Sequence, residues 1–334
     1  MVRRAVGLVL LVLPVCLGAG TATRPAERDF TFQYGATITG MAPGKVARIW
    51  LPEAYTNEDQ TVRLVSKPAD ARETIEPTYG NHLLYVERAA GADGTIAVDC
   101  VFHVERREVT GAGPEKPGEA REARRFLGAD AKVPVGGKGL ALIEGKALPE
   151  DPIALGRVLY DAVDDHMQYR KDKPGWGTGD SNWAYDSKFG NCTDFHSLFI
   201  SLARAEHLPA KFEIGFLLGP PSTTEAKVPG YHCWAKFKPP GKDWMPVDIS
   251  EANQHPTDRD LDFGTLTSNR VMFTLGRDLV LNPRQAGGPV NFLVYPYVEV
   301  DGAVWPQDKI QKRFSYQDDA DGSTRNTPRM DMNQ

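Results

Sequence analysis

Three residues in the second half of the chain have side chains that together could carry out nucleophilic catalysis: Cys192, His232 and Asp248. A cysteine attacks carbonyl carbon as the thiolate. A neighbouring imidazole accepts and returns the proton, while a carboxylate fixes the imidazole tautomer and stabilises its charged form. Each residue alone is more common in a structural role, so the interpretation depends on whether the fold brings the three together.

Cys192 stands where a helix is predicted to begin, and that helix extends to about His207. Asn191 can cap this helix, and Asp194 can complete a capping box. A thiol in the first turn faces unpaired backbone N–H groups and the positive end of the helix dipole, which favour the thiolate. The predicted buried stripe of the helix consists of Phe195, Leu198, Phe199 and Leu202.

The other two residues belong to a predicted hairpin over 231–249. Strand alternation puts His232 and Trp234 on one face and Cys233 on the other. A tight turn is predicted at K-P-P-G-K, residues 238–242. With the turn centred near Pro240, His232 lies opposite Asp248, with Cβ atoms about 4.5 to 5.5 Å apart. A bulge in the turn would shift this pairing by one residue.

The remaining elements predict an α+β fold in two domains. Period-two segments between residues 26 and 109 predict an N-terminal antiparallel β-sandwich domain. Residues 110–149 read as a charged linker or excursion, and 150–312 as the catalytic domain. That domain opens with a helix from Asp151 to about Tyr169, with Pro152 at its first position. Its last predicted strand covers 291–300, and the polar residues 313–334 are expected to form a disordered tail.

Composition and the N-terminus limit the class of protein. The 334 residues are 41% hydrophobic and 25% charged with a net charge of -5, which argues against nucleic-acid binding. Residues 1–22 have the layout of a signal peptide, so a periplasmic or secreted protein is expected, with membrane contact only before cleavage. A lipid anchor on Cys16 is not expected, because no small residue precedes it.

Removal of the signal segment leaves three cysteines, Cys100, Cys192 and Cys233, and an odd number cannot all pair. Cys100 is predicted to be a small core residue. A bridge between Cys100 and Cys233 is not expected, because they lie in different predicted domains. We expect serine at either of these two positions to leave activity largely intact.

Several segments resemble the transglutaminase-like superfamily: F-G-N-C-T-D-F-H at 189–196, R-A-E-H-L-P-A at 204–210, G-Y-H-C-W at 230–234 and D-W-M-P-V-D at 243–248. The resemblance implies a papain-like core with Cys192 as nucleophile, His232 as acid and base, and Asp248 as its orienting residue. It also implies a thioester intermediate formed from an amide or ester, and an oxyanion bound by the Cys192 N–H group, with Trp183 as a candidate second donor. Calcium-dependent crosslinking is not expected, because the additional domains and calcium sites of animal transglutaminases are not seen.

The expected partner is a peptide or protein substrate, with no cofactor and no metal. Four tryptophans are proposed to line a substrate cleft: Trp176, Trp183, Trp234 and Trp244. A metal site involving Cys192, His196, His232 and Cys233 is disfavoured by strand alternation. Arylamine acetyl transfer is disfavoured because the expected arginine and glycines before the cysteine are missing. A noncatalytic envelope-binding module on the same scaffold stays an alternative. The sequence specifies neither the oligomeric state nor the acyl acceptor, water or an amine.

Overall fold

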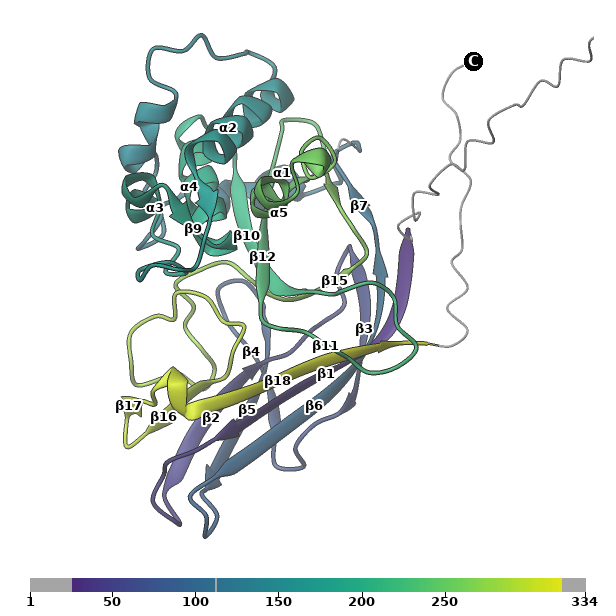
Figure 1. Ribbon diagram of the computed structural model, residues 1–334, viewed down its shortest axis with the longest axis vertical. Coiled ribbons are helices and arrows are strands. Elements are labelled where there is room, and N and C mark those ends of the chain that lie inside the picture. Colours follow the sequence, from purple (N-terminus) through teal and green to yellow (C-terminus); the bar gives the residue numbers. More distant parts are fainter. Residues whose placement is uncertain (1–25, 112, 320–334) are drawn as a thin grey trace, which may run out of the picture.

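The computed structural model describes residues 26–111 and 113–319, which form a mixed fold of antiparallel sheets and helices (Figure 1). The predicted signal segment lies outside the described residues. The three larger sheets are antiparallel, as expected for an α+β fold. Within the described ranges, no helix is long and apolar enough to cross a membrane.

The first five-stranded sheet is built on two long strands that expose alternate residues. On β6, Cys100 and Phe102 face the core, and Cys100 is buried as predicted. On β1, Phe32 points the same way. The strand order is β11 (Ala226–Lys227), β18 (Ile310–Asp318), β1 (Glu27–Ile38), β6 (Ile96–Arg107) and β3 (Gln60–Ser66).

The second five-stranded sheet also combines strands from the two ends of the chain. Its order is β17 (Ala303–Val304), β16 (Tyr297–Val300), β2 (Val46–Pro52), β5 (His82–Ala89) and β4 (Arg72–Ile75). Inward residues of both sheets, such as Phe32 and Ile49, belong to one buried cluster. The short helix η4 (Gln307–Lys309) leads into β18.

These strands correct two of the predicted boundaries. Residues 297–318 belong to the sheets of the N-terminal half, because β16 pairs with β2 and β18 pairs with β1. The expected tail therefore begins inside strand β18, and residues 320–334 lie outside the described part. The strand predicted at 291–300 is confined to 297–300. The β-sandwich assigned to the N-terminal domain and the papain-like core assigned to the catalytic domain stay predictions.

The helical half surrounds a four-stranded sheet of order β13 (Met245–Val247), β12 (His232–Phe237), β10 (Ala210–Leu217) and β15 (Arg270–Leu275). Helix α4 (Cys192–Ala205) packs against β12 and is almost entirely buried (Figure 1). Around it lie α2 (Pro152–His166), α3 (Ser181–Ser187) and α5 (Ile249–Gln254), followed by η3 (Pro256–Asp258). Pro152 is the first residue of α2, as predicted, and the side chain of Asp151 caps the helix.

Residues 110–149 form a packed excursion. It contains α1 (Glu119–Ala123), η1 (Arg124–Leu127) and η2 (Gly137–Leu142). Phe126 packs edge-on against Trp244 at 5.5 Å between ring centroids, which fastens the excursion to the helical half. Two small sheets join distant segments: β7 (Val109–Thr110) with β14 (Thr265–Leu266), and β8 (Gln168–Tyr169) with β9 (Phe189–Gly190).

The two halves share a continuous interior. Phe216 and Phe273, on β10 and β15, pack against Phe32 and Phe102 of the first five-stranded sheet, with centroid separations of 5.0 and 5.5 Å. The amide of Gln60 exchanges hydrogen bonds with the backbone of Met272. The four-stranded sheet is therefore covered by α4 on one side and by the N-terminal half on the other.

Candidate active site

The start of α4 has the local structure that the sequence predicts. The side chain of Asn191 accepts hydrogen bonds from the first turn, and Asp194 accepts one from the Asn191 N–H group at 3.0 Å. The Asp194 carboxylate also accepts from the N–H groups of Gly177 and Gly179. Both glycines have positive φ, which suits the close approach of this loop. Asp194 thus holds the preceding loop against the helix end that carries Cys192.

His232 and Asp248 lie in direct contact, with 2.7 Å between His232 Nε2 and Asp248 Oδ2. The predicted register of the hairpin is wrong by two residues, because Ala235 pairs with Val247 and the connection between the strands is longer than a tight turn. Asp248 follows the strand as the N-cap of α5. The carboxylate reaches back to His232 from this cap, so the contact survives the different register.

The Cys192 sulfur accepts a hydrogen bond from the His232 ring. Because Nε2 faces Asp248, Nδ1 is the nitrogen left for the sulfur. Burial alone would lower the pKa of His232, but the Asp248 carboxylate outweighs it and raises that pKa to about 10. Burial would likewise raise the pKa of Cys192, but hydrogen bonds from Cys233 and His232 hold it well below its usual range. Both shifts favour a thiolate paired with an imidazolium.

Cys233 belongs to this cluster, which the sequence did not predict. It hydrogen-bonds the Cys192 sulfur, and its own sulfur lies 3.5 Å from Nδ1 of His196. His196 Nε2 accepts the N–H group of Ile249 at 3.1 Å, so the neutral ring carries its proton on Nδ1 and donates it to Cys233. Burial lowers the pKa of His196 to about 4, which keeps this ring neutral.

Arg270 is the second residue that the sequence did not identify. Its Nη1 donates to Asp248 Oδ2 at 2.6 Å, the same oxygen that accepts from His232. The other oxygen, Oδ1, accepts from the Ser250 hydroxyl and the Glu251 N–H group. Burial would raise the pKa of Asp248, but His232 and Arg270 hold it well below its usual range. Asp248 is thus fixed as an anion.

The predicted tryptophan cleft is not supported. Trp234 is fully buried and donates to Glu213 Oε2 at 2.7 Å, and its assignment to a substrate cleft stays a prediction. Trp183 packs edge-on against Phe189, whereas Trp244 packs against Phe126 in a separate cluster. The role of Trp183 at the oxyanion stays a prediction.

The nucleophile lies beneath the surface. Cys192 is 1% exposed and His232 is 5% exposed. The phenols of Tyr169, Tyr231 and Tyr295 lie near enough for the Cys192 charge to raise their pKa, in addition to the larger effect of burial. The Tyr231 hydroxyl accepts a hydrogen bond from Asn191 Nδ2 at 2.8 Å. Access to the sulfur therefore requires movement of the surrounding side chains.

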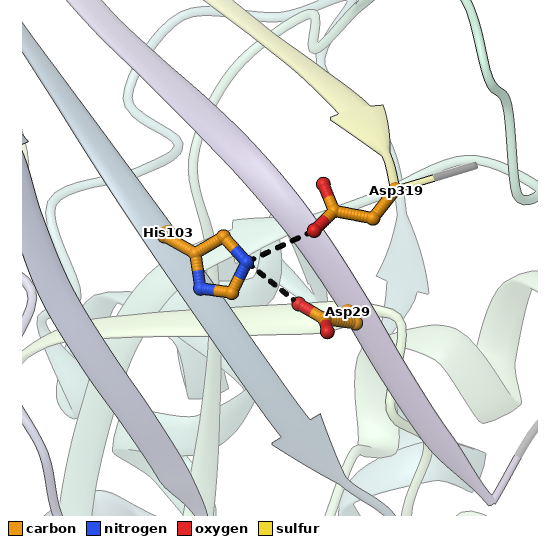
Figure 2. Close-up of side chains that lie close together, drawn as sticks. All are labelled: Asp29, His103 and Asp319. Atoms are coloured by element: carbon orange, nitrogen blue, oxygen red, sulfur yellow. Dashed lines mark hydrogen bonds and ion pairs between the residues drawn. The ribbon is translucent and has the colours of Figure 1, made fainter. Parts of the chain in front are cut away.

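A second histidine cluster lies on the outer face of the first five-stranded sheet. His103 Nε2 is 3.0 Å from Asp29 Oδ1 and 3.0 Å from Asp319 Oδ2 (Figure 2). Asp29, His103 and Asp319 each offer one atom of a kind that binds metal ions, and in the described part of the chain these three atoms lie within 4.8 Å of one another. In the structure, His103 itself bridges the two carboxylates. At the first cluster, His196 Nε2 is occupied by a backbone N–H group and is not free to bind a metal.

Comparison with known proteins agrees with the motifs. Residues 143–249 match the family model of the transglutaminase-like superfamily. This range contains all three predicted catalytic residues. A Haemophilus influenzae protein without an assigned function is 25% identical over 318 residues, covering 82% of this chain and 86% of its own length.

Two solved structures are similar to this chain. A candidate cysteine protease from Cytophaga hutchinsonii has a TM-score of 0.53 at 16% identity, covering 87% of this chain and 99% of that one. The periplasmic domain of TgpA from Pseudomonas aeruginosa has a TM-score of 0.38 at 16% identity, covering 71% of this chain and 95% of that one. The Cytophaga structure supports the mixed fold across both halves of the chain.

Proposed function

We propose that this chain, whose residues 143–249 belong to the transglutaminase-like superfamily, is a cysteine-dependent enzyme that acts on peptide or protein amides. The observation that carries the proposal is the buried contact of Cys192 with His232, itself held by Asp248 at 2.7 Å. This arrangement supplies a nucleophile, a proton donor and a fixed orientation for that donor.

The proposed reaction starts with attack of the Cys192 thiolate on the amide carbonyl carbon. The tetrahedral intermediate collapses as the His232 imidazolium protonates the leaving amine, which yields a thioester and a neutral imidazole. Water or an amine then attacks the thioester, and His232 takes the proton of that acceptor. Asp248, kept ionised by Arg270, stabilises the imidazolium at the start and end of this cycle. The Cys192 N–H group is the proposed oxyanion donor.

The burial of Cys192 favours one alternative, a noncatalytic binding module. Cys192 is only 1% exposed, so a peptide cannot reach its sulfur in this conformation. However, a module without catalytic function has no need of an ionised thiol held against an imidazolium. The two possibilities differ in whether the sulfur of the folded protein ever reaches an acyl donor.

The proposed function is tested by intact-mass detection of an acyl adduct after incubation with a peptide library, with and without added amines. We expect an adduct on Cys192 that disappears in Cys192→Ala, with Cys100→Ala as the matched control. Faster loss of the adduct on addition of amines identifies an acyltransferase, whereas loss in water alone identifies a hydrolase. Peptide turnover that persists in Cys192→Ala would overturn the proposal.

We also propose that the protein acts outside the cytoplasm, in the periplasm or after secretion. The support is the signal-like segment at 1–22, which lies outside the described residues. Determination of the N-terminal residue of the mature protein in the extracytoplasmic fraction tests this. A chain that retains Met1 and stays in the cytoplasm would contradict it.

A further inference from the structure

We propose that Cys192 and Cys233 form a site of reversible oxidative modification, at which a peroxide converts the two thiols into a disulfide and blocks the nucleophile. Both cysteines are free and buried in the structure. The loss of activity rests on the proposed function, whereas formation of the disulfide depends only on the two sulfur atoms and their surroundings.

The geometry brings the two sulfur atoms together from separate elements. Cys192 occupies the first turn of α4, and Cys233 is the second residue of β12, against which α4 packs. The Cys233 sulfur is 3.5 Å from Nδ1 of His196, which lies one helical turn beyond Cys192 on α4, and the two thiol groups interact with each other. Cys100 lies on β6 in the other half of the molecule. Cys192 and Cys233 are therefore the two thiols that neighbouring elements place to form a disulfide, whereas Cys100 belongs to a different sheet.

The surroundings give the two sulfur atoms different roles. Cys192 accepts hydrogen bonds from Cys233 and His232, which favour its thiolate, the form that attacks peroxides. Burial and the neighbouring Cys192 charge keep Cys233 protonated. The His196 Nδ1–H group faces Cys233 at 3.5 Å, where it stabilises negative charge on that sulfur as its proton leaves. Cys192 is thus the sulfur that reacts first, and Cys233 is the resolving thiol.

The chemistry balances with hydrogen peroxide as the oxidant. The Cys192 thiolate attacks one oxygen, the O–O bond breaks, and the His232 imidazolium protonates the departing hydroxide, which leaves a sulfenic acid and water. Cys233 then attacks the sulfenic sulfur, the S–O bond breaks, and the departing hydroxide takes the Cys233 proton as a second water. Two thiols lose two electrons and the peroxide gains them. A peroxide is far smaller than a peptide, so it needs a smaller opening to reach the buried sulfur.

The test uses the purified mature chain treated with increasing hydrogen peroxide, then denatured and alkylated. We expect a mass lower by two hydrogens, a peptide containing the Cys192–Cys233 link, and Cys100 still open to alkylation. Dithiothreitol restores both thiols. In Cys233→Ala, Cys192 instead gains oxygen atoms that dithiothreitol does not fully remove. Cys100→Ser is the matched control and still forms the link. Thermal melting of each variant shows whether it is folded.

The outcomes separate this proposal from the proposed function. Oxygen addition to Cys192 in the wild-type chain, without a link to Cys233, would overturn the proposal. Resistance of both thiols to peroxide in the folded chain would overturn it as well. A reversible link in a chain that never forms an acyl adduct would support the modification site and contradict the proposed amide chemistry. With both correct, amide turnover falls in proportion to the linked fraction and returns with dithiothreitol.

Discussion

His232 and His103 each lie between two acidic groups, yet their surroundings differ in one decisive respect. His232 contacts Asp248 at 2.7 Å and the Cys192 sulfur, with Asp248 fully buried. His103 contacts Asp29 and Asp319 at 3.0 Å, and those carboxylate side chains are 42% and 44% exposed. The contact distances are similar, so distance alone does not distinguish the buried histidine from the one at the surface.

The two histidines differ in how strongly solvent screens the charges around them. Around His232 the charges interact with little screening, so Asp248 outweighs the effect of burial and the imidazolium is retained. Around His103, water and salt screen the attraction to the two carboxylates. Asp248 also has a second cation, Arg270, and two further hydrogen-bond donors. Burial, together with the pairing of Asp248 with two cationic side chains, therefore distinguishes the first cluster from the second.

The sharpest way to break this comparison is to replace each histidine in turn. His232→Ala removes the proton donor and the partner of the thiolate, so we expect kcat/KM for amide turnover to fall by about 10³-fold. His103→Ala is the matched control and should change kcat/KM by less than about twofold, because its cluster lies on the sheet face. Equal losses in the two variants would contradict the assignment.

The next effect concerns the arginine partners. Arg270→Met leaves the buried Asp248 without one cation, so we expect the free energy of unfolding in urea to fall by about 3 kcal/mol. Arg313→Met removes an exposed contact to Asp99 and should change it by less than about 1 kcal/mol. A loss of the same size in both variants would show that burial does not set the strength of the pair.

The pH profile reports the charge of His232 directly. Its pKa is raised to about 10, so the imidazolium persists through neutral pH and is lost as pH rises through about 10. We expect kcat/KM to fall by about tenfold per pH unit above that midpoint. If kcat/KM instead falls with a midpoint near the pKa of an unperturbed histidine, Asp248 does not stabilise the charged ring.

Cys233 and Cys100 allow a finer comparison of two buried thiols. Cys233→Ala removes a hydrogen-bond donor to the Cys192 thiolate. We therefore expect the fall of kcat/KM on the acid side of the pH profile to move to higher pH, so that kcat/KM at acidic pH is about fivefold lower than in the wild type. Cys100 lies on β6 in the N-terminal half, so Cys100→Ala should leave the pH profile of kcat/KM unchanged. This revises the sequence-based expectation for Cys233. An unshifted acid limb in Cys233→Ala would restore that expectation.

The smallest expected effect is on stability at the sheet face. His103→Ala removes two contacts to exposed carboxylates, so we expect the free energy of unfolding to change by less than about 1 kcal/mol, and by less again at high salt. Urea denaturation at two ionic strengths measures this. A larger loss, insensitive to salt, would show that the cluster is more than a screened surface contact.

The sequence was sufficient for the local structure around the nucleophile. The capping box of Asn191 and Asp194, the helix from Cys192 and the helix with Pro152 at its first position follow from short-range preferences, and the structure confirms them. The contact of His232 with Asp248 was also predicted, although for a register two residues away. The register differs because prolines and a glycine limit a turn without fixing its length.

The missed features depend on contacts between distant segments. Arg270 follows Asp248 by 22 residues in the chain, and no motif links the two before β15 is placed beside β10. Cys233 was assigned correctly to the face opposite Trp234, but alternation does not reveal which helix covers that face. Strand β18 did carry a signal, since Ile310, Phe314 and Tyr316 are buried at even spacing. Its polar neighbours obscured that pattern.

The central claim is tested most directly by the rate at which iodoacetamide alkylates Cys192, followed by intact mass across a pH series. A thiolate paired with His232 predicts a rate that is nearly constant from about pH 6 to pH 9. In His232→Ala, the same rate should rise with pH through the range of an ordinary thiol. A wild-type rate that already rises through that range would contradict the account, because Cys192 would then be a neutral thiol at neutral pH.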